Sequence, residues 1–199
     1  MNAKTIQYLK SKDPILEQII GRVKVLPSIE PNPLFHDVMA CIIEQQIPYR
    51  STKKLFEKLL SKADLVVLTP ANYAQFERLA LQDIKLSGRK LETIVRITQL
   101  FTEEDAKGAD KDEMIRLIST TKGIGNWTFE MLRLFNLMEA DIFPADDYHL
   151  KNIMVELYEL DPDQKLKAQM KEVAESWKPH RSLGVRLLFA FQEYRRLMK

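Results

Sequence analysis

The sequence has very little cysteine: Cys41 is the only one among 199 residues, and it lies in an apolar stretch. One cysteine cannot form an internal disulfide, a zinc finger or a four-cysteine iron–sulfur cluster. The three histidines, His36, His149 and His180, do not have the spacing of a metal site either. We therefore expect no iron–sulfur cluster and no required cofactor. We interpret Cys41 as a small buried apolar residue, with a catalytic thiol as the alternative.

Long apolar runs and an excess of one charge are also missing. No run approaches the roughly 18 apolar residues that cross a membrane, and the first residues lack the apolar core of a signal peptide. The 30 Lys and Arg residues nearly balance the 28 Asp and Glu residues, which leaves a net charge of +2. We expect a cytosolic protein without membrane contact. A nucleic-acid partner would have to be bound by a local positive face.

Glycine is scarce, with six residues, and the alternating pattern of strands is rare, whereas apolar residues recur with the period of a helix. This periodicity predicts helices after Pro33, after a turn at residues 45–48, and over 182–197. We interpret residues 87–90 as a turn and 103–113 as a surface loop. The sequence thus predicts an all-α protein, although residues 1–33 leave room for short strands, for example at 22–26.

The segment most informative about chemistry is Lys122-Gly123-Ile124-Gly125, which separates two helical patterns. Two glycines around one apolar residue permit a tight hairpin and leave backbone N–H groups uncovered beside a helix N-terminus. Such a nest binds a phosphate, and Lys122 would add a cation. Taken alone, the pattern fits an ordinary helix–turn–helix corner equally well.

A pair of adjacent carboxylates, Asp146 and Asp147, follows Pro144 at a predicted helix start. Adjacent helical positions do not share a face. One carboxylate can therefore cap the helix by accepting backbone N–H bonds while the other points elsewhere. The alternative is that both simply decorate the first turn.

Together these segments resemble the helix-hairpin-helix (HhH-GPD) DNA glycosylase superfamily, and within it the branch of 3-methyladenine DNA glycosylase II. The resemblance covers about residues 34–195. Five ordered blocks carry it, namely Ile42–Ile47, Leu86–Lys90, Gly123–Thr128, Phe143–Asp147 and Trp177–Ser182. It implies one HhH-GPD unit over residues 1–199, with two helical lobes and the active-site cleft between them. One lobe would comprise about residues 34–145, with the hairpin at 114–135, and the other 1–33 plus 146–199.

The resemblance also implies a mechanism and assigns residues to it. The enzyme would flip a damaged nucleotide out of the duplex, and Asp147 would stabilise the positive charge that the departing base leaves on the sugar. Asp146 would cap the helix, and the substrate pocket would be formed by Trp127, Met131 and Tyr148. Trp127 stands where superfamily members with lyase activity carry a nucleophilic lysine. The resemblance therefore implies a monofunctional glycosylase for alkylated purines in base-excision repair, without lyase activity.

The implied partner is double-stranded DNA with damaged bases, bound by a monomer in the cytoplasm (the bacterial nucleoid) or in a eukaryotic nucleus. DNA contacts would come from Lys122, Gly123, Ile124, Gly125 and Thr128, and from a wedge inserted at Gln46 or Ile47. The hairpin could also hold sodium or potassium through the backbone carbonyls of Ser119, Thr121 and Ile124. Trp177 and Arg181 fit a buried structural role as well as substrate contact. The alternative function is a non-catalytic helix-hairpin-helix protein that binds damaged DNA. The preferred lesion is left open.

Overall fold

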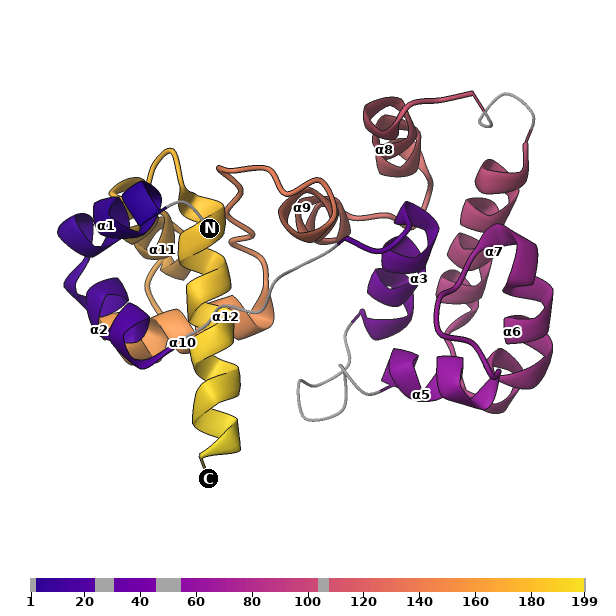
Figure 1. Ribbon diagram of the computed structural model, residues 1–199, viewed down its shortest axis with the longest axis horizontal. Coiled ribbons are helices and arrows are strands. Elements are labelled where there is room, and N and C mark those ends of the chain that lie inside the picture. Colours follow the sequence, from indigo (N-terminus) through magenta and orange to yellow (C-terminus); the bar gives the residue numbers. More distant parts are fainter. Residues whose placement is uncertain (1–2, 24–30, 46–54, 104–107, 199) are drawn as a thin grey trace. The chain divides into compact units, whose positions relative to one another are not determined.

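The computed structural model describes residues 3–23, 31–45, 55–103 and 108–198, and over these ranges the chain is helical without a strand (Figure 1). The all-α prediction is therefore confirmed. Residues 3–22, where short strands had room, form two helices instead, and 24–30 lie outside the described residues. Within these ranges, no helix has both the length and the apolar character needed to cross a membrane.

The chain divides into two compact units, residues 1–30 with 133–199, and residues 31–132. The second boundary falls inside α9 (Asn126–Phe135), whereas the sequence placed it near residue 145. The first unit contains α1 (Ala3–Lys12), α2 (Pro14–Arg22), α10 (Tyr148–Tyr158), α11 (Leu166–Glu175) and α12 (Arg181–Leu197). The second contains α3 (Leu34–Glu44), α5 (Leu55–Lys62), α6 (Tyr73–Leu79), α7 (Gly88–Thr102), α8 (Lys111–Thr120) and two short 3-10 helices, Pro70–Asn72 and Leu81–Asp83.

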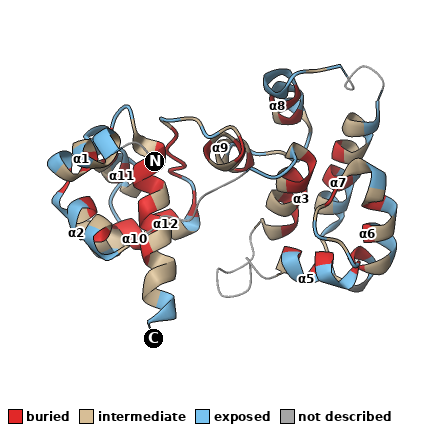
Figure 2. Ribbon diagram, viewed as in Figure 1, coloured by how far each residue is buried: buried red, intermediate tan, exposed pale blue. Residues whose placement is uncertain are grey.

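The first unit is built around α12, which packs against α2, α10 and α11. The apolar stripe of α12 is buried (Figure 2), and Gly184 lets Trp177 approach the helix backbone, because a Cβ there would lie 2.6 Å from Trp177 Cε3. Trp177 is fully buried and donates its indole N–H to Asp13 Oδ2 at 2.7 Å. Tyr158 donates its hydroxyl to the same oxygen at 2.8 Å, and Asp13 also caps α2. The two N-terminal helices are thereby fixed to the core of this unit.

The second unit buries aromatic and branched side chains from α3, α5, α6 and α7 (Figure 2). On α3, His36 Nδ1 accepts a hydrogen bond from the Leu68 N–H at 3.0 Å, and burial lowers the pKa of this histidine. Cys41 lies on the same helix, where burial of the thiol, reinforced by Asp37 and Glu44, raises its pKa to about 12. A thiol that stays protonated at neutral pH is a poor nucleophile, which argues against a catalytic role for the half-buried Cys41.

Candidate active site and DNA-binding hairpin

The helix-hairpin-helix motif consists of α8, a turn over residues 121–125, and α9. The Ile124 N–H donates to the Thr121 carbonyl at 3.0 Å and closes the turn. Gly123 has φ +104°, and an ideal Cβ at this position would lie 1.9 Å from Thr93 Oγ1. Thr93 is a buried residue of α7 whose hydroxyl donates to the Arg89 carbonyl at 2.8 Å. Glycine is therefore required at 123 both for its backbone angle and for close packing against α7.

The outer edge of the hairpin is open. Lys122, Gly123 and Gly125 are exposed, and Ile124 is half-buried. A Cβ at Gly125 would meet no atom within 4 Å. The backbone around Gly125 is thus open to solvent, as a phosphate nest requires.

Thr128 corrects one expectation. This residue is fully buried, and its hydroxyl accepts a hydrogen bond from Gln45 Nε2 at 2.6 Å. The prediction that Thr128 contacts DNA is wrong, because its side chain is used inside the protein to join α9 to the end of α3. The wedge candidates Gln46 and Ile47 lie outside the described residues.

Lys90 is a structural residue of this region. Its ammonium donates to the carbonyls of Ile43 at 2.9 Å and Gln45 at 2.6 Å, and burial lowers its pKa. These carbonyls belong to the last turn of α3, which has no further helical N–H to bond them. Residues 87–90, interpreted as a turn, instead start α7, with Ser87 as its N-cap. The ends of α3, α7 and α9 therefore meet at Gln45.

Trp127 and Met131, two of the predicted pocket residues, are four residues apart on α9 and both are half-buried. Residues with this spacing share one helix face. The third, Tyr148, is the first residue of α10, where it is 65% exposed and its ring meets His149 edge-on at 5.3 Å. The exposed Tyr148 ring is large enough to stack on a base.

The two carboxylates have distinct environments, but the cap is not the one expected. Asp147, not Asp146, is the N-cap of α10: its Oδ1 accepts the Leu150 N–H at 2.7 Å, and the residue is only 3% exposed. Asp146 is exposed and pairs with Lys167 and, at 3.7 Å, with Lys151. The hydrogen bond from Lys167 is the main cause that lowers the pKa of Asp146. The cap prediction for Asp146 is wrong because α10 begins one residue later than that prediction needs.

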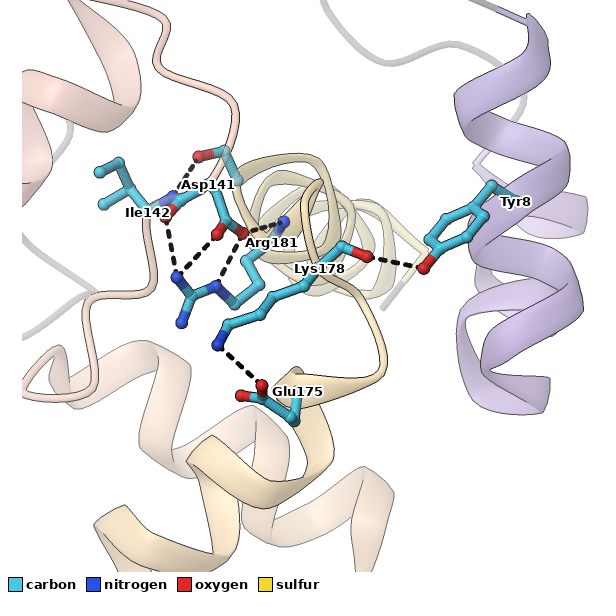
Figure 3. Close-up of polar contacts among 7 residues, drawn as sticks. Tyr8, Asp141, Ile142, Glu175, Lys178 and Arg181 are labelled. Atoms are coloured by element: carbon cyan, nitrogen blue, oxygen red, sulfur yellow. Dashed lines mark hydrogen bonds and ion pairs between the residues drawn. The ribbon is translucent and has the colours of Figure 1, made fainter.

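The loop that leads to Asp147 is held by the start of α12 (Figure 3). Arg181 forms a two-pronged ion pair with Asp141, with Nε–Oδ1 at 2.7 Å and Nη2–Oδ2 at 2.9 Å. Ser182 Oγ accepts the Ile142 N–H at 2.8 Å, and the Ser182 N–H donates to the Ala140 carbonyl at 3.1 Å. The segment from Trp177 to Ser182 is therefore structural, and it fixes residues 140–142 of the loop that precedes Asp147.

Asp141 was missed by sequence reasoning. It directly precedes the Ile-Phe-Pro stretch, but only its pairing with Arg181, forty residues later, reveals its role. The Arg181 guanidinium holds the pKa of this carboxyl below its usual value.

Comparison with known proteins agrees with this architecture. Residues 39–179, more than half of the chain, match the model of the HhH-GPD superfamily of base excision DNA repair proteins. DNA-3-methyladenine glycosylase 1 of Schizosaccharomyces pombe is 25% identical, over 69% of this chain and 63% of its own length. A protein of Bacillus subtilis named putative DNA-3-methyladenine glycosylase YfjP is 29% identical, over 75% and 55%. The chain thus spans about 60% of the length of these two curated relatives.

Solved structures show the same fold. The 3-methyladenine DNA glycosylase Mag1 of S. pombe, solved with abasic DNA, aligns with a TM-score of 0.72 at 22% identity over 94% of this chain and 95% of that one. The 3-methyladenine DNA glycosylase of Archaeoglobus fulgidus aligns with a TM-score of 0.73 at 23% identity, over 98% and 70%. The family match, the hairpin and the all-helical fold lead to one assignment: the chain belongs to the HhH-GPD superfamily of base excision DNA repair proteins.

Proposed function

We propose that this protein is a monofunctional DNA glycosylase that removes alkylated purines of the 3-methyladenine type from double-stranded DNA. The observation that carries the proposal is the buried, helix-capping Asp147 in a chain of this superfamily. A cap alone needs no acid, since serine or asparagine serves about as well as aspartate. A carboxylate adds a full negative charge, which is what the proposed reaction uses.

In the proposed reaction the nucleotide leaves the base stack, and the bond between the base and the sugar breaks. The bonding electron pair leaves with the base, and the sugar develops positive charge that the Asp147 carboxylate stabilises. Water then adds its oxygen to the sugar carbon and releases a proton. The hydrogen bond from Leu150 keeps one carboxylate oxygen oriented before the reaction, so little reorganisation is needed when charge develops.

Trp127, Met131 and Tyr148 are proposed to accept the flipped base. An alkylated purine carries positive charge, and aromatic rings attract a cation over their faces. An indole cannot attack a sugar, so the proposal includes no lyase step at Trp127.

The hairpin edge at Lys122, Gly123, Ile124 and Gly125 is proposed to hold a DNA phosphate. The carbonyls of Ser119, Thr121 and Ile124 would hold a monovalent cation. The Thr121 carbonyl fits this role because it accepts one N–H within the turn and retains a second lone pair. The proposed active form is a monomer that works where the DNA is, in a bacterial cytoplasm or a eukaryotic nucleus.

The competing function is a non-catalytic binder of damaged DNA. The test is release of free base from DNA methylated with a radioactive alkylating agent. The proposal expects labelled 3-methyladenine in the soluble fraction with the wild type and none above background with Asp147→Asn. Tight binding of alkylated DNA by the wild type without base release would establish the binder instead.

A further inference from the structure

Two lysines pair with Asp146, the exposed carboxylate next to Asp147, and a third lysine shares a shallow pocket with them, in the unit formed by residues 1–30 and 133–199. Lys151 and Lys167 both pair with Asp146 Oδ1. Lys165 lies with them around a shallow pocket of about 510 Å³, which is also lined by Leu166 and Ala168. Three ammonium groups against one carboxylate leave an excess charge of +2 in this small area.

This excess is not explained by ion pairing within the protein. Asp146 is the one carboxylate that pairs with these lysines in the described part of the chain, and it uses one oxygen for two of them. Ammonium groups gathered at one place repel one another unless an anion joins them. Lys165 also has φ +43°, a left-handed backbone conformation that lysine rarely adopts. Lys165 is the N-cap residue of α11, but its side chain makes no capping hydrogen bond.

The position of the cluster indicates which anion it takes. If Asp147 acts on the sugar of a flipped nucleotide, the phosphates bonded to that sugar must pass close to Asp147. Asp146 is its chain neighbour, and the lysines on Asp146 are thereby beside the path of the strand. We propose that Lys151, Lys165 and Lys167 form a second phosphate-binding site for the DNA strand, separate from the hairpin. This inference rests on the proposed function.

Asp146 has a defined part in this site. It pairs with Lys151 and Lys167 in the free protein. Asp146 also competes with the incoming phosphate for the same ammonium groups. Removing its charge should therefore strengthen binding to DNA, whereas removing a polar group that contacts DNA would weaken it.

The test is the salt dependence of binding to a short undamaged duplex, which requires no catalysis. Each phosphate contact contributes about 0.9 to the slope of log affinity against log salt, measured between about 50 and 200 mM. In the double variant Lys165→Asn, Lys167→Gln, the slope should fall by about 0.9. Asparagine tolerates the left-handed backbone at 165, so the fold should be kept. Asp146→Asn should raise the affinity.

The charge-matched comparison is between the single variants Lys167→Gln and Lys171→Gln, which lie one turn apart on α11, are both exposed and lose one charge each. Lys171→Gln should leave the slope unchanged. An equal fall in these two single variants would refute the site, because it would show a general effect of lost charge. If the slope is unchanged in the double variant but base release is slower, the phosphate site is refuted as well. The lysines would then act by positioning Asp146. Inorganic phosphate that binds the wild type but not the double variant, without displacing the duplex at matched ionic strength, would overturn the assignment to a DNA strand.

These outcomes are separable from the proposed function. If the slope falls in the double variant but the wild type releases no base, the phosphate site is supported and the glycosylase is refuted. If the wild type releases base but the slope is the same in the double variant, the glycosylase is supported and the phosphate site is refuted.

Discussion

Gly123 and Gly125 are a matched pair of positions on which the account of the hairpin can be tested with the same substitution. At Gly123 an alanine must adopt φ +104° and place its methyl group 1.9 Å from Thr93 Oγ1. The backbone strain costs about 1–3 kcal/mol, and the overpacking adds about 1–3 kcal/mol. We expect Gly123→Ala to lower the free energy of unfolding by about 2–6 kcal/mol. At Gly125 the added methyl meets no atom within 4 Å, and stability should change by no more than about 0.5 kcal/mol.

The assays are urea denaturation and duplex binding. Gly125→Ala should keep the urea midpoint but weaken binding to damaged and undamaged duplexes alike, since the hairpin contacts phosphate and reads no base. Thr93→Ala removes the Oγ1 and Cγ2 atoms that the new methyl would meet, so it should recover part of the stability lost in Gly123→Ala, by about 1 kcal/mol or more. A fully stable Gly123→Ala would refute the packing argument. Unchanged DNA affinity in Gly125→Ala would refute the phosphate nest, and a changed lesion preference would contradict its sequence-independent role.

Other substitutions test the carboxylate, its support and the absence of lyase chemistry. Asp147→Asn should keep the fold and DNA binding but lose base release by about a hundredfold or more; near-wild-type release would remove Asp147 from the reaction. Asp141→Asn should flatten the pH dependence of stability below about pH 4. The reason is that Arg181 lowers the pKa of Asp141. The ion pair therefore stabilises the fold at pH values above the ordinary pKa of aspartate, and this stabilisation is lost as the pH falls through the lowered pKa. Identical melting curves of wild type and Asp141→Asn at acid pH would contradict this. Product DNA should carry an intact abasic site, and borohydride should trap no covalent complex; a trapped complex that vanishes in Lys122→Ala would refute the monofunctional reading of Trp127.

Helices with a strong apolar stripe were predictable from sequence. The helix expected over 182–197 is Arg181–Leu197 in the structure, because its buried residues recur with helical period and need no distant partner to define them. The N-terminal helices were not predicted, since part of their stabilisation is remote. Asp13 receives hydrogen bonds from Trp177 and Tyr158, which lie more than a hundred residues away.

The roles of the two aspartates illustrate a different limit. Local rules allow either Asp146 or Asp147 to cap the helix, because both precede its first turn. The choice is fixed by where the loop is anchored, through the bonds of Arg181 and Ser182 to residues 140–142. Thr128 is a similar case. A polar residue beside a hairpin glycine fits DNA contact from sequence alone, and only the position of Gln45 shows that its hydroxyl is already bonded.

Both units therefore use the same construction at their functional segments. In one, Lys90 and Gln45 tie the end of α3 to the starts of α7 and α9. In the other, the start of α12 ties down the loop before Asp147. The bonds of Lys90 and Arg181 are charge-assisted and contribute about 1.5–3 kcal/mol each, whereas the neutral bonds of Gln45 and Ser182 contribute about 0.5–1.5 kcal/mol each. All of them join segments far apart in sequence. Residues in the blocks around Lys90 and Arg181 can therefore be essential for binding or base release without contacting DNA. A conservative replacement of such a residue, for example Lys90→Arg, should then keep part of the activity. A conservative replacement of a DNA-contacting or catalytic residue should not.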